Sequence, residues 1–149
     1  MIAVKYFMII LVILMSCQGC GSKISSRGEQ NNSKLVDLGN GICRQDNGLM
    51  WQIERSGKFS SFEDANNYLD TMDLGGYNDW RFPTKDELYM LSYLFEMKHS
   101  GDCPLKPKGS YWSKNGKEEA GEWYAYPLCG GPEFQYLESE TGRVRAVRP

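Results

Sequence analysis

Few side chains in this sequence could carry out covalent or metal chemistry. The chain has 149 residues, with one histidine and five cysteines. Nucleophilic catalysis needs a base beside a serine or cysteine, and His99 alone offers little to build such a site from. Among the cysteines, Cys17 and Cys20 are close in sequence, but they belong to the N-terminal segment described below, so zinc-type spacing is missing. We therefore predict no catalytic residues, no metal and no cofactor.

Oxygen-donor side chains leave calcium as an alternative. Several acidic and amide side chains after residue 100 could act as ligands, although they do not follow the spacing of an EF-hand loop. They are Asp102, Asn115, Glu118, Glu119, Glu122 and Glu133. Acidic surface turns are more often simply solvated, so a calcium site is the less favoured interpretation.

Aromatic residues and lysines in the C-terminal half indicate binding rather than catalysis. Five aromatic residues fall on neighbouring predicted strands, and we expect Trp112 to be core and Tyr124 or Tyr126 to face outward. Lysines frame the same region and could meet an anionic polymer or be plain solvated surface. The predicted ligand-binding residues are Lys108, Lys114, Asn115, Tyr124, Tyr126 and Glu133. The net charge of −2 shows no excess of basic residues of the kind that binds nucleic acid, so no nucleic-acid partner is predicted.

The elements that must position these residues form an α+β pattern. Two helices are predicted, one from Phe62 and closed by Gly75, the other from about Lys85 to Met97. Short strands precede and follow them, at 35–38, 42–44, 49–53, 111–113, 122–126, 134–137 and 143–148. Helices grouped early with hairpins afterwards predict an α+β domain on an antiparallel sheet.

A stretch from Gly75 to Leu88 connects the two helices. Phe82 precedes Pro83, which disfavours a helical conformation there and predicts an extended segment. Thr84 is a predicted helix N-cap, with Glu87 as its capping-box partner. The motif residues are Asp79, Trp80, Arg81, Pro83, Thr84 and Glu87. We interpret them as a structural clamp, with Arg81 paired to a nearby acid such as Asp79 or Asp86.

The N-terminus has the pattern of an export signal. Lys5 precedes an apolar run that ends at Met15, which is too short to span a membrane. Leu14-Met15-Ser16-Cys17 resembles a bacterial lipobox, which predicts a signal peptide over 1–16 and a lipid anchor at Cys17. An ordinary cleaved signal peptide is the alternative. Residues 17–34 then form a polar tether, and 35–149 form the domain. The predicted location is the bacterial cell envelope, at the outer membrane if the host is Gram-negative.

Four sequence stretches occur together in an order that resembles a known family. They are 46–52 (Asp-Asn-Gly-Leu-Met-Trp-Gln), 76–88 (with Asp-Trp-Arg-Phe-Pro-Thr), 111–113 (Tyr-Trp-Ser) and 144–148 (Val-Arg-Ala-Val-Arg). Together they resemble the Lcl C-terminal-domain family, formerly a bacterial domain of unknown function, over roughly residues 35–149. The resemblance implies a C-type-lectin-like fold, in which two helices flank a small twisted antiparallel sheet with a long irregular loop region. It also implies no catalytic residues, because the shared motifs are structural. The best-known member of the family binds sulfated polysaccharides and supports adhesion.

The cysteines depart from that family pattern. Leu69 and Ala146 stand where members often carry a disulfide, so packing is expected to replace the bridge. Pairing Trp112 with Trp123 across a hairpin would bring the flanking segments together, which predicts a Cys103–Cys129 disulfide in an exported protein. Two free buried thiols are the alternative. Cys43 is expected to be a small buried residue. Arg145 and Arg148 match the family motif and are expected to form structural ion pairs.

The sequence therefore predicts a membrane-anchored envelope lipoprotein with a noncatalytic domain. Its partners would be the membrane, through the lipid, and a polysaccharide or envelope protein, bound in the loops from Gly101 to Glu133. The alternative is an envelope enzyme or assembly factor related by fold to formylglycine-generating oxidases. Those enzymes use two active-site cysteines, and Ala146 holds an expected cysteine position here, which disfavours that alternative.

Overall fold

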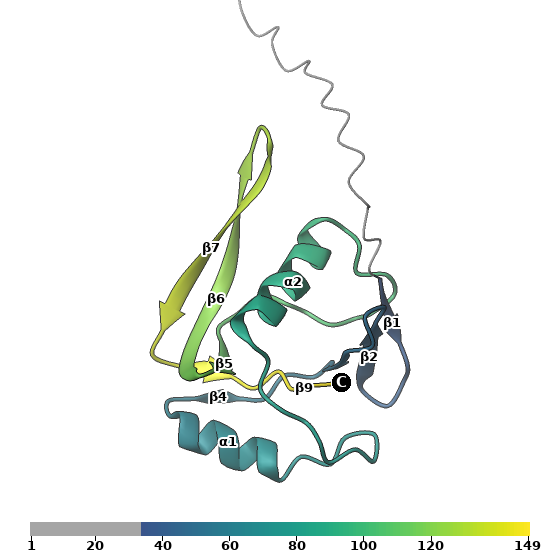
Figure 1. The fold of residues 1–149 in the computed structure, drawn as a ribbon, viewed down its shortest axis with the longest axis vertical. Coiled ribbons are helices and arrows are strands. Elements are labelled where there is room, and N and C mark those ends of the chain that lie inside the picture. Colours follow the sequence, from purple (N-terminus) through teal and green to yellow (C-terminus); the bar gives the residue numbers. More distant parts are fainter. Residues whose placement is uncertain (1–33) are drawn as a thin grey trace, which may run out of the picture. The chain divides into compact units, whose positions relative to one another are not determined.

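The computed structural model describes residues 34–149. The predicted signal peptide, the Cys17 anchor and nearly all of the tether lie outside the described residues. Within them the fold is α+β, as predicted, with two helices and two sheets (Figure 1). The helices are α1 (Phe62–Asp70) and α2 (Lys85–Glu96).

The first sheet joins the two ends of the domain. Its strands run in the order β1-β2-β3-β9, and each neighbouring pair is antiparallel. They are β1 (Leu35–Asp37), β2 (Ile42–Gln45), β3 (Met50–Gln52) and β9 (Val147–Arg148). The predicted Asn47-Gly48 turn links β2 to β3, with Gly48 at a φ of 95° that glycine adopts readily.

The second sheet carries a long hairpin. Its strand order is β4-β8-β5-β6-β7, with all pairs antiparallel except β5 and β8. The strands are β4 (Lys58–Phe59), β8 (Gly142–Arg143), β5 (Tyr111–Asn115), β6 (Lys117–Leu128) and β7 (Gly131–Ser139). The β6–β7 hairpin extends beyond α2 (Figure 1). The strands predicted at 111–113 and 122–126 are present but longer, so little of the range 111–133 is left for the predicted long irregular loop region.

The helix starts follow local capping chemistry. Ser61 accepts a hydrogen bond from the backbone N–H of Asp64 at 3.1 Å, and α1 begins there as predicted. Thr84 and Glu87 form the predicted capping box, with bonds of 3.1 and 2.8 Å. The end of α1 differs from prediction, because Gly75 lies past the helix in a separate turn, with a φ of 67°.

The clamp motif ties the start of α2 to the last strand. Backbone bonds of 2.9 and 3.0 Å join Arg81 to Val147 in both directions. Arg81 pairs with Glu87 at 2.7 Å, and not with Asp79 or Asp86 as predicted. Asp79 instead holds Arg148 at 2.6 Å, as expected of a structural ion pair for that arginine, and the contact holds the Asp79 pKa below its usual range. The motif is therefore structural in every contact described.

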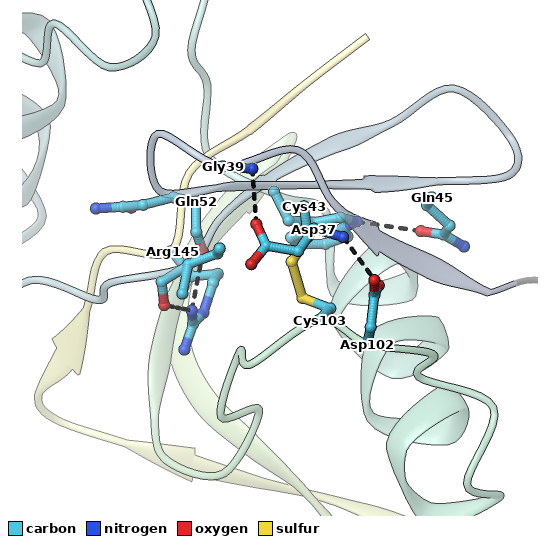
Figure 2. The surroundings of a disulfide bond; sticks show 10 residues. Asp37, Gly39, Cys43, Gln45, Gln52, Asp102, Cys103 and Arg145 are labelled. Atoms are coloured by element: carbon cyan, nitrogen blue, oxygen red, sulfur yellow. Dashed lines mark hydrogen bonds between the residues drawn. A yellow bond between two sulfur atoms is a disulfide. The ribbon is translucent and has the colours of Figure 1, made fainter.

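The disulfide joins Cys43 to Cys103, with Cα atoms 5.9 Å apart (Figure 2), so the predicted Cys103–Cys129 bridge is wrong. Cys129 is exposed and bonds to no described cysteine. The error came from the hairpin register, because Trp112 lies opposite Ala120 and not opposite a second tryptophan. Residue 129 is consequently carried to the far tip of the next hairpin. Cys43 is buried, as predicted, but it is bonded.

Leu69 and Ala146 are packed in the core, as predicted. Leu69 and Ala146 belong to the same buried cluster, together with Trp112, Trp80 and Val144. Trp112 is therefore core, as predicted. The last predicted strand is divided, because the chain between β8 and β9 is irregular and fully buried.

Candidate functional site

The loop between α2 and β5 is held at its middle by three contacts. Cys103 is bonded to Cys43 in β2, and the adjacent Asp102 accepts a hydrogen bond of 3.0 Å from the backbone N–H of Asp37 (Figure 2). Leu105 is buried in the first core cluster. The following residues, 106–110, are therefore presented from a fixed base rather than from a free loop.

A buried arginine lies beneath residues 106–110. The Arg145 guanidinium donates to the carbonyl of Lys106 at 2.7 Å, the hydroxyl of Tyr111 at 2.8 Å and the carbonyl of Gln52 at 2.9 Å. It has no carboxylate partner among the described residues, so the predicted ion pair is wrong for Arg145. Burial lowers the pKa of this group, yet an arginine remains charged near neutral pH.

A second guanidinium supports the same loop. Arg55 donates to the carbonyl of Lys108 at 2.6 Å and lies 3.4 Å from the hydroxyl of Tyr111. That hydroxyl in turn bonds the carbonyls of Lys106 and Lys108, at 3.1 and 3.3 Å. The loop carbonyls thus face inward onto two cations, while the Lys108 side chain is exposed.

The side chains above this network line an open pocket of about 540 Å³, here called the basal pocket. Four of its lining residues are basic and two are acidic, which leaves an excess of positive charge. They are Arg55, Lys58, Lys108 and Arg143, with Glu122 and Glu138. Glu122 is fixed in place, because it accepts a bond of 2.8 Å from the backbone N–H of Gly109. The pocket can bind an anionic group and offer a carboxylate to a hydroxyl.

An aromatic pocket of about 220 Å³ adjoins the basal pocket and shares Lys108 and Glu122 with it. Tyr124 lines it, and the rings of Tyr124 and Tyr126 have centroids 4.7 Å apart. These tyrosines are 47% and 40% exposed, which confirms the predicted outward aromatics. Trp123 also lines this pocket, and its indole N–H donates to the carbonyl of Lys85 at the start of α2, at 2.9 Å.

The predicted ligand-binding residues divide between two places. Lys108 and Tyr124 meet at the aromatic pocket, and Glu133 lies opposite Tyr126 in the hairpin. Lys114 lies elsewhere, because its ammonium group pairs with Glu118 at 3.2 Å. Tyr124 is six residues further along β6 than Glu118, about 20 Å at the usual strand rise.

Asn115 lies with Lys114 at the β5–β6 turn, so it too is remote from the pockets. Sequence reasoning missed Arg55 and Lys58, and it placed Arg143 on the last strand without assigning it to the ligand site. These three meet because β4 pairs with β8, where Lys58 lies opposite Arg143. Neither short strand carries a periodic pattern that would have revealed this pairing.

Two of the side chains considered as calcium ligands already have other partners. Glu119 contacts the ammonium groups of Lys85 and Lys117, at 3.2 and 3.7 Å, and Asp102 accepts from a backbone N–H. Over residues 34–149, the structure holds no group of three acidic, histidine or cysteine side chains placed to bind a metal ion. In the same range, no helix has the length and apolar character needed to cross a membrane.

Comparison with known proteins identifies the family. The family model of the Lcl C-terminal domain matches residues 42–148, which takes in all but the first of the described strands and both helices. No curated protein and no solved structure matches the chain. Because the match covers well over half of the sequence, the chain belongs to the Lcl C-terminal domain family.

Proposed function

We propose that this protein is a noncatalytic binding module of the bacterial envelope that holds an anionic carbohydrate at the basal pocket. The observation that carries the proposal is the excess of cations there. Arg55, Lys58, Lys108 and Arg143 line the pocket. Beneath the same loop, Arg145 adds a buried charge that has no carboxylate partner among the described residues. A cleft lined by one sign of charge raises the local concentration of an oppositely charged ligand.

The shape and chemistry of the two pockets fit a sugar chain. The basal pocket has a volume in the range usual for small-ligand sites. Tyr124 lines the adjoining aromatic pocket, and its exposed side chain offers an apolar face of the kind that packs against a sugar ring. Glu122 accepts a backbone bond and retains acceptor capacity for a hydroxyl. Together these groups favour a charged saccharide over a simple inorganic anion.

The proposed setting is a lipid-anchored domain on the cell envelope, attached through Cys17. The lipobox-like sequence Leu14-Met15-Ser16-Cys17 supports this location. We extend the proposal to the fold, which we regard as C-type-lectin-like. Two helices, a strand pairing between the ends of the domain and a projecting hairpin support that assignment. A protein partner in the envelope is compatible with the same location.

A binding panel on the purified full-length chain tests the function. The probes are a heparin-like sulfated polymer, a polymer charged only through uronates and neutral dextran, each measured at low and at physiological salt. The proposal expects saturable binding to at least one charged polymer, weakening as salt rises, and none to dextran. Lack of binding to both charged polymers would contradict it. Oxidation of a peptide thiol by the same sample would favour the oxidase-like alternative instead.

A further inference from the structure

The last strand of the second sheet, β7, is an unpaired edge. The strand order ends at β7, and no element lies beyond it in Figure 1. All nine of its residues are exposed or half-buried. Long exposed edges of this kind are ready templates for another strand.

The hairpin register shows which backbone groups β7 offers. Pro127 lies directly opposite Pro132, and neither has an N–H, so this pair is of the non-hydrogen-bonded kind. Backbone direction alternates along a strand, so Phe134, Tyr136 and Glu138 also turn their N–H and C=O groups outward. Outside the strand ladders, no backbone hydrogen bond within residues 34–149 uses these three N–H groups. Three donors in a row are therefore available to a further strand.

The side chains of β7 differ between its two faces. Phe134 and Tyr136 lie on the face toward α2, where they pack against Tyr89 and Trp123, with ring centroids 5.2 and 5.3 Å apart. Glu133 lies on the opposite, exposed face, and no described cation pairs with it. A strand added to β7 would therefore meet an aromatic surface on one face and a free carboxylate on the other.

Charge along the hairpin decides what kind of strand fits. The stretch 118–142 contains no lysine, arginine or histidine. It contains six glutamates, of which Glu118 and Glu119 pair with lysines outside the stretch and Glu122 bonds the backbone N–H of Gly109. The other three, Glu133, Glu138 and Glu140, have no cationic partner among the described residues. A second copy would bring another acidic hairpin alongside the first, and like charges across a strand pair repel. A basic segment is attracted along the same edge.

We infer that β7 binds an extended polypeptide segment in which cationic and apolar residues alternate. The segment adds to the sheet as a further strand, pairing with the backbone of Phe134, Tyr136 and Glu138. Its cationic side chains lie on the face of Glu133, and its apolar side chains lie beside Phe134 and Tyr136. This surface reaches the basal pocket where β7 ends, since Leu137, Glu138 and Ser139 line that pocket, but it selects a ligand of the opposite charge.

The test uses a nine-residue peptide of alternating lysine and valine with blocked ends, added to the full-length chain. Binding is followed by fluorescence anisotropy and by hydrogen exchange of individual amides. We expect saturable binding that weakens with salt and slows exchange at Phe134, Tyr136 and Glu138. Two further peptides of the same charge carry N-methyl groups on alternate amides, one peptide for each register. The peptide whose methylated amides face β7 should bind at least about tenfold more weakly than the other, because it loses its strand pairing.

Two matched variants locate the charge contribution. Glu133→Gln should weaken peptide binding about two- to fivefold, the usual range for an exposed ion pair, while Glu140→Gln, outside β7, should change it less than twofold. Lys108→Gln should leave peptide binding unchanged, which distinguishes peptide binding from binding at the basal pocket. Equal binding by both N-methylated peptides, protection of other amides, or self-association of the chain through β7 would each overturn the inference.

Discussion

The guanidinium of Arg145 donates a hydrogen bond of 2.8 Å to the hydroxyl of Tyr111, across 34 positions of sequence. Both groups also bond the carbonyl of Lys106, so a single buried network fixes the loop above it. The same loop presents Lys108 to the basal pocket. Arg145, in the irregular segment between β8 and β9, thus helps to fix the position of Lys108, a candidate ligand-binding residue.

Tyr111→Phe tests that network. The substitution keeps the buried ring but removes the hydroxyl that joins Arg145 and Arg55 to the loop carbonyls. Leaving buried groups with fewer partners should lower the free energy of unfolding by about 1–3 kcal/mol. Urea denaturation measures this change. Tyr124→Phe is the matched control, because its exposed hydroxyl should contribute less than about 0.5 kcal/mol. Equal stability of the two variants would contradict the assigned network.

The Cys43–Cys103 bridge makes a separate prediction. It closes a loop with a sequence separation of 60, so the double substitution Cys43→Ala with Cys103→Ala should cost about 4 kcal/mol in the chain-entropy model. Denaturation in guanidinium chloride measures the loss. Cys129→Ser should leave stability unchanged, since its thiol is exposed. Peptide mapping without reductant should link Cys43 to Cys103, and a Cys103–Cys129 peptide would refute the pairing.

Glu87 predicts a specific pH dependence of stability. Burial tends to raise its pKa, but hydrogen bonds from Arg81 and from the backbone N–H of Thr84 outweigh that effect and lower it. A depressed carboxyl pKa stabilises the fold above the ordinary glutamate value of about 4.3, and the contribution is lost as pH falls through the lower folded value.

Glu87→Gln measures that contribution, since glutamine can still serve in a capping box. At pH 7 the variant should be less stable than the natural chain by up to about 1 kcal/mol, because Arg81 is partly exposed. The difference should shrink as the pH falls below about 4.3, where the unfolded carboxylate takes up its proton first. Urea titrations at several pH values follow it. A difference independent of pH would rule out the ionic explanation.

Local signals made much of this fold predictable. Thr84 and Glu87, three residues apart, predict a helix start, and Asn47-Gly48 predicts a tight turn. Both signals are readable because each depends only on residues that are neighbours in sequence. The hairpin register was also encoded locally. Gly116, with a φ of 77°, sets the turn that places Trp112 opposite Ala120. Matching two tryptophans instead led to the wrong disulfide.

The basal pocket could not be predicted in the same way. Ser56, beside Arg55, accepts a hydrogen bond from Arg143 across 87 positions, and the intervening chain contains both helices. No periodic pattern links two strands of two residues each. Lys114 and Lys108 are both lysines near aromatic residues in the sequence, but strand geometry separates them. Side chains assembled by long-range pairing need the fold before they can be recognised as one site.

The proposed anchor is tested in cells. Cys17→Ser should release the protein from the membrane fraction, because no lipid can then be attached at that position. Fractionation with antibody detection measures the distribution, and Cys20→Ser is the matched control that should remain membrane-bound. Unchanged membrane association of the Cys17→Ser protein would contradict the lipid anchor.

The most direct test of anionic carbohydrate binding compares two lysines. Lys108→Gln removes a cation from the basal pocket while leaving the backbone carbonyl that Arg55 and Tyr111 hold. Lys114→Gln makes the same change of charge at a residue paired with Glu118. The affinity of each full-length chain for a heparin-like polymer is measured by calorimetry at physiological salt. We predict a loss of about tenfold for Lys108→Gln, as for one charge-assisted hydrogen bond, and less than about twofold for Lys114→Gln. Equal effects of the two substitutions, or none for Lys108→Gln, would contradict the proposed site.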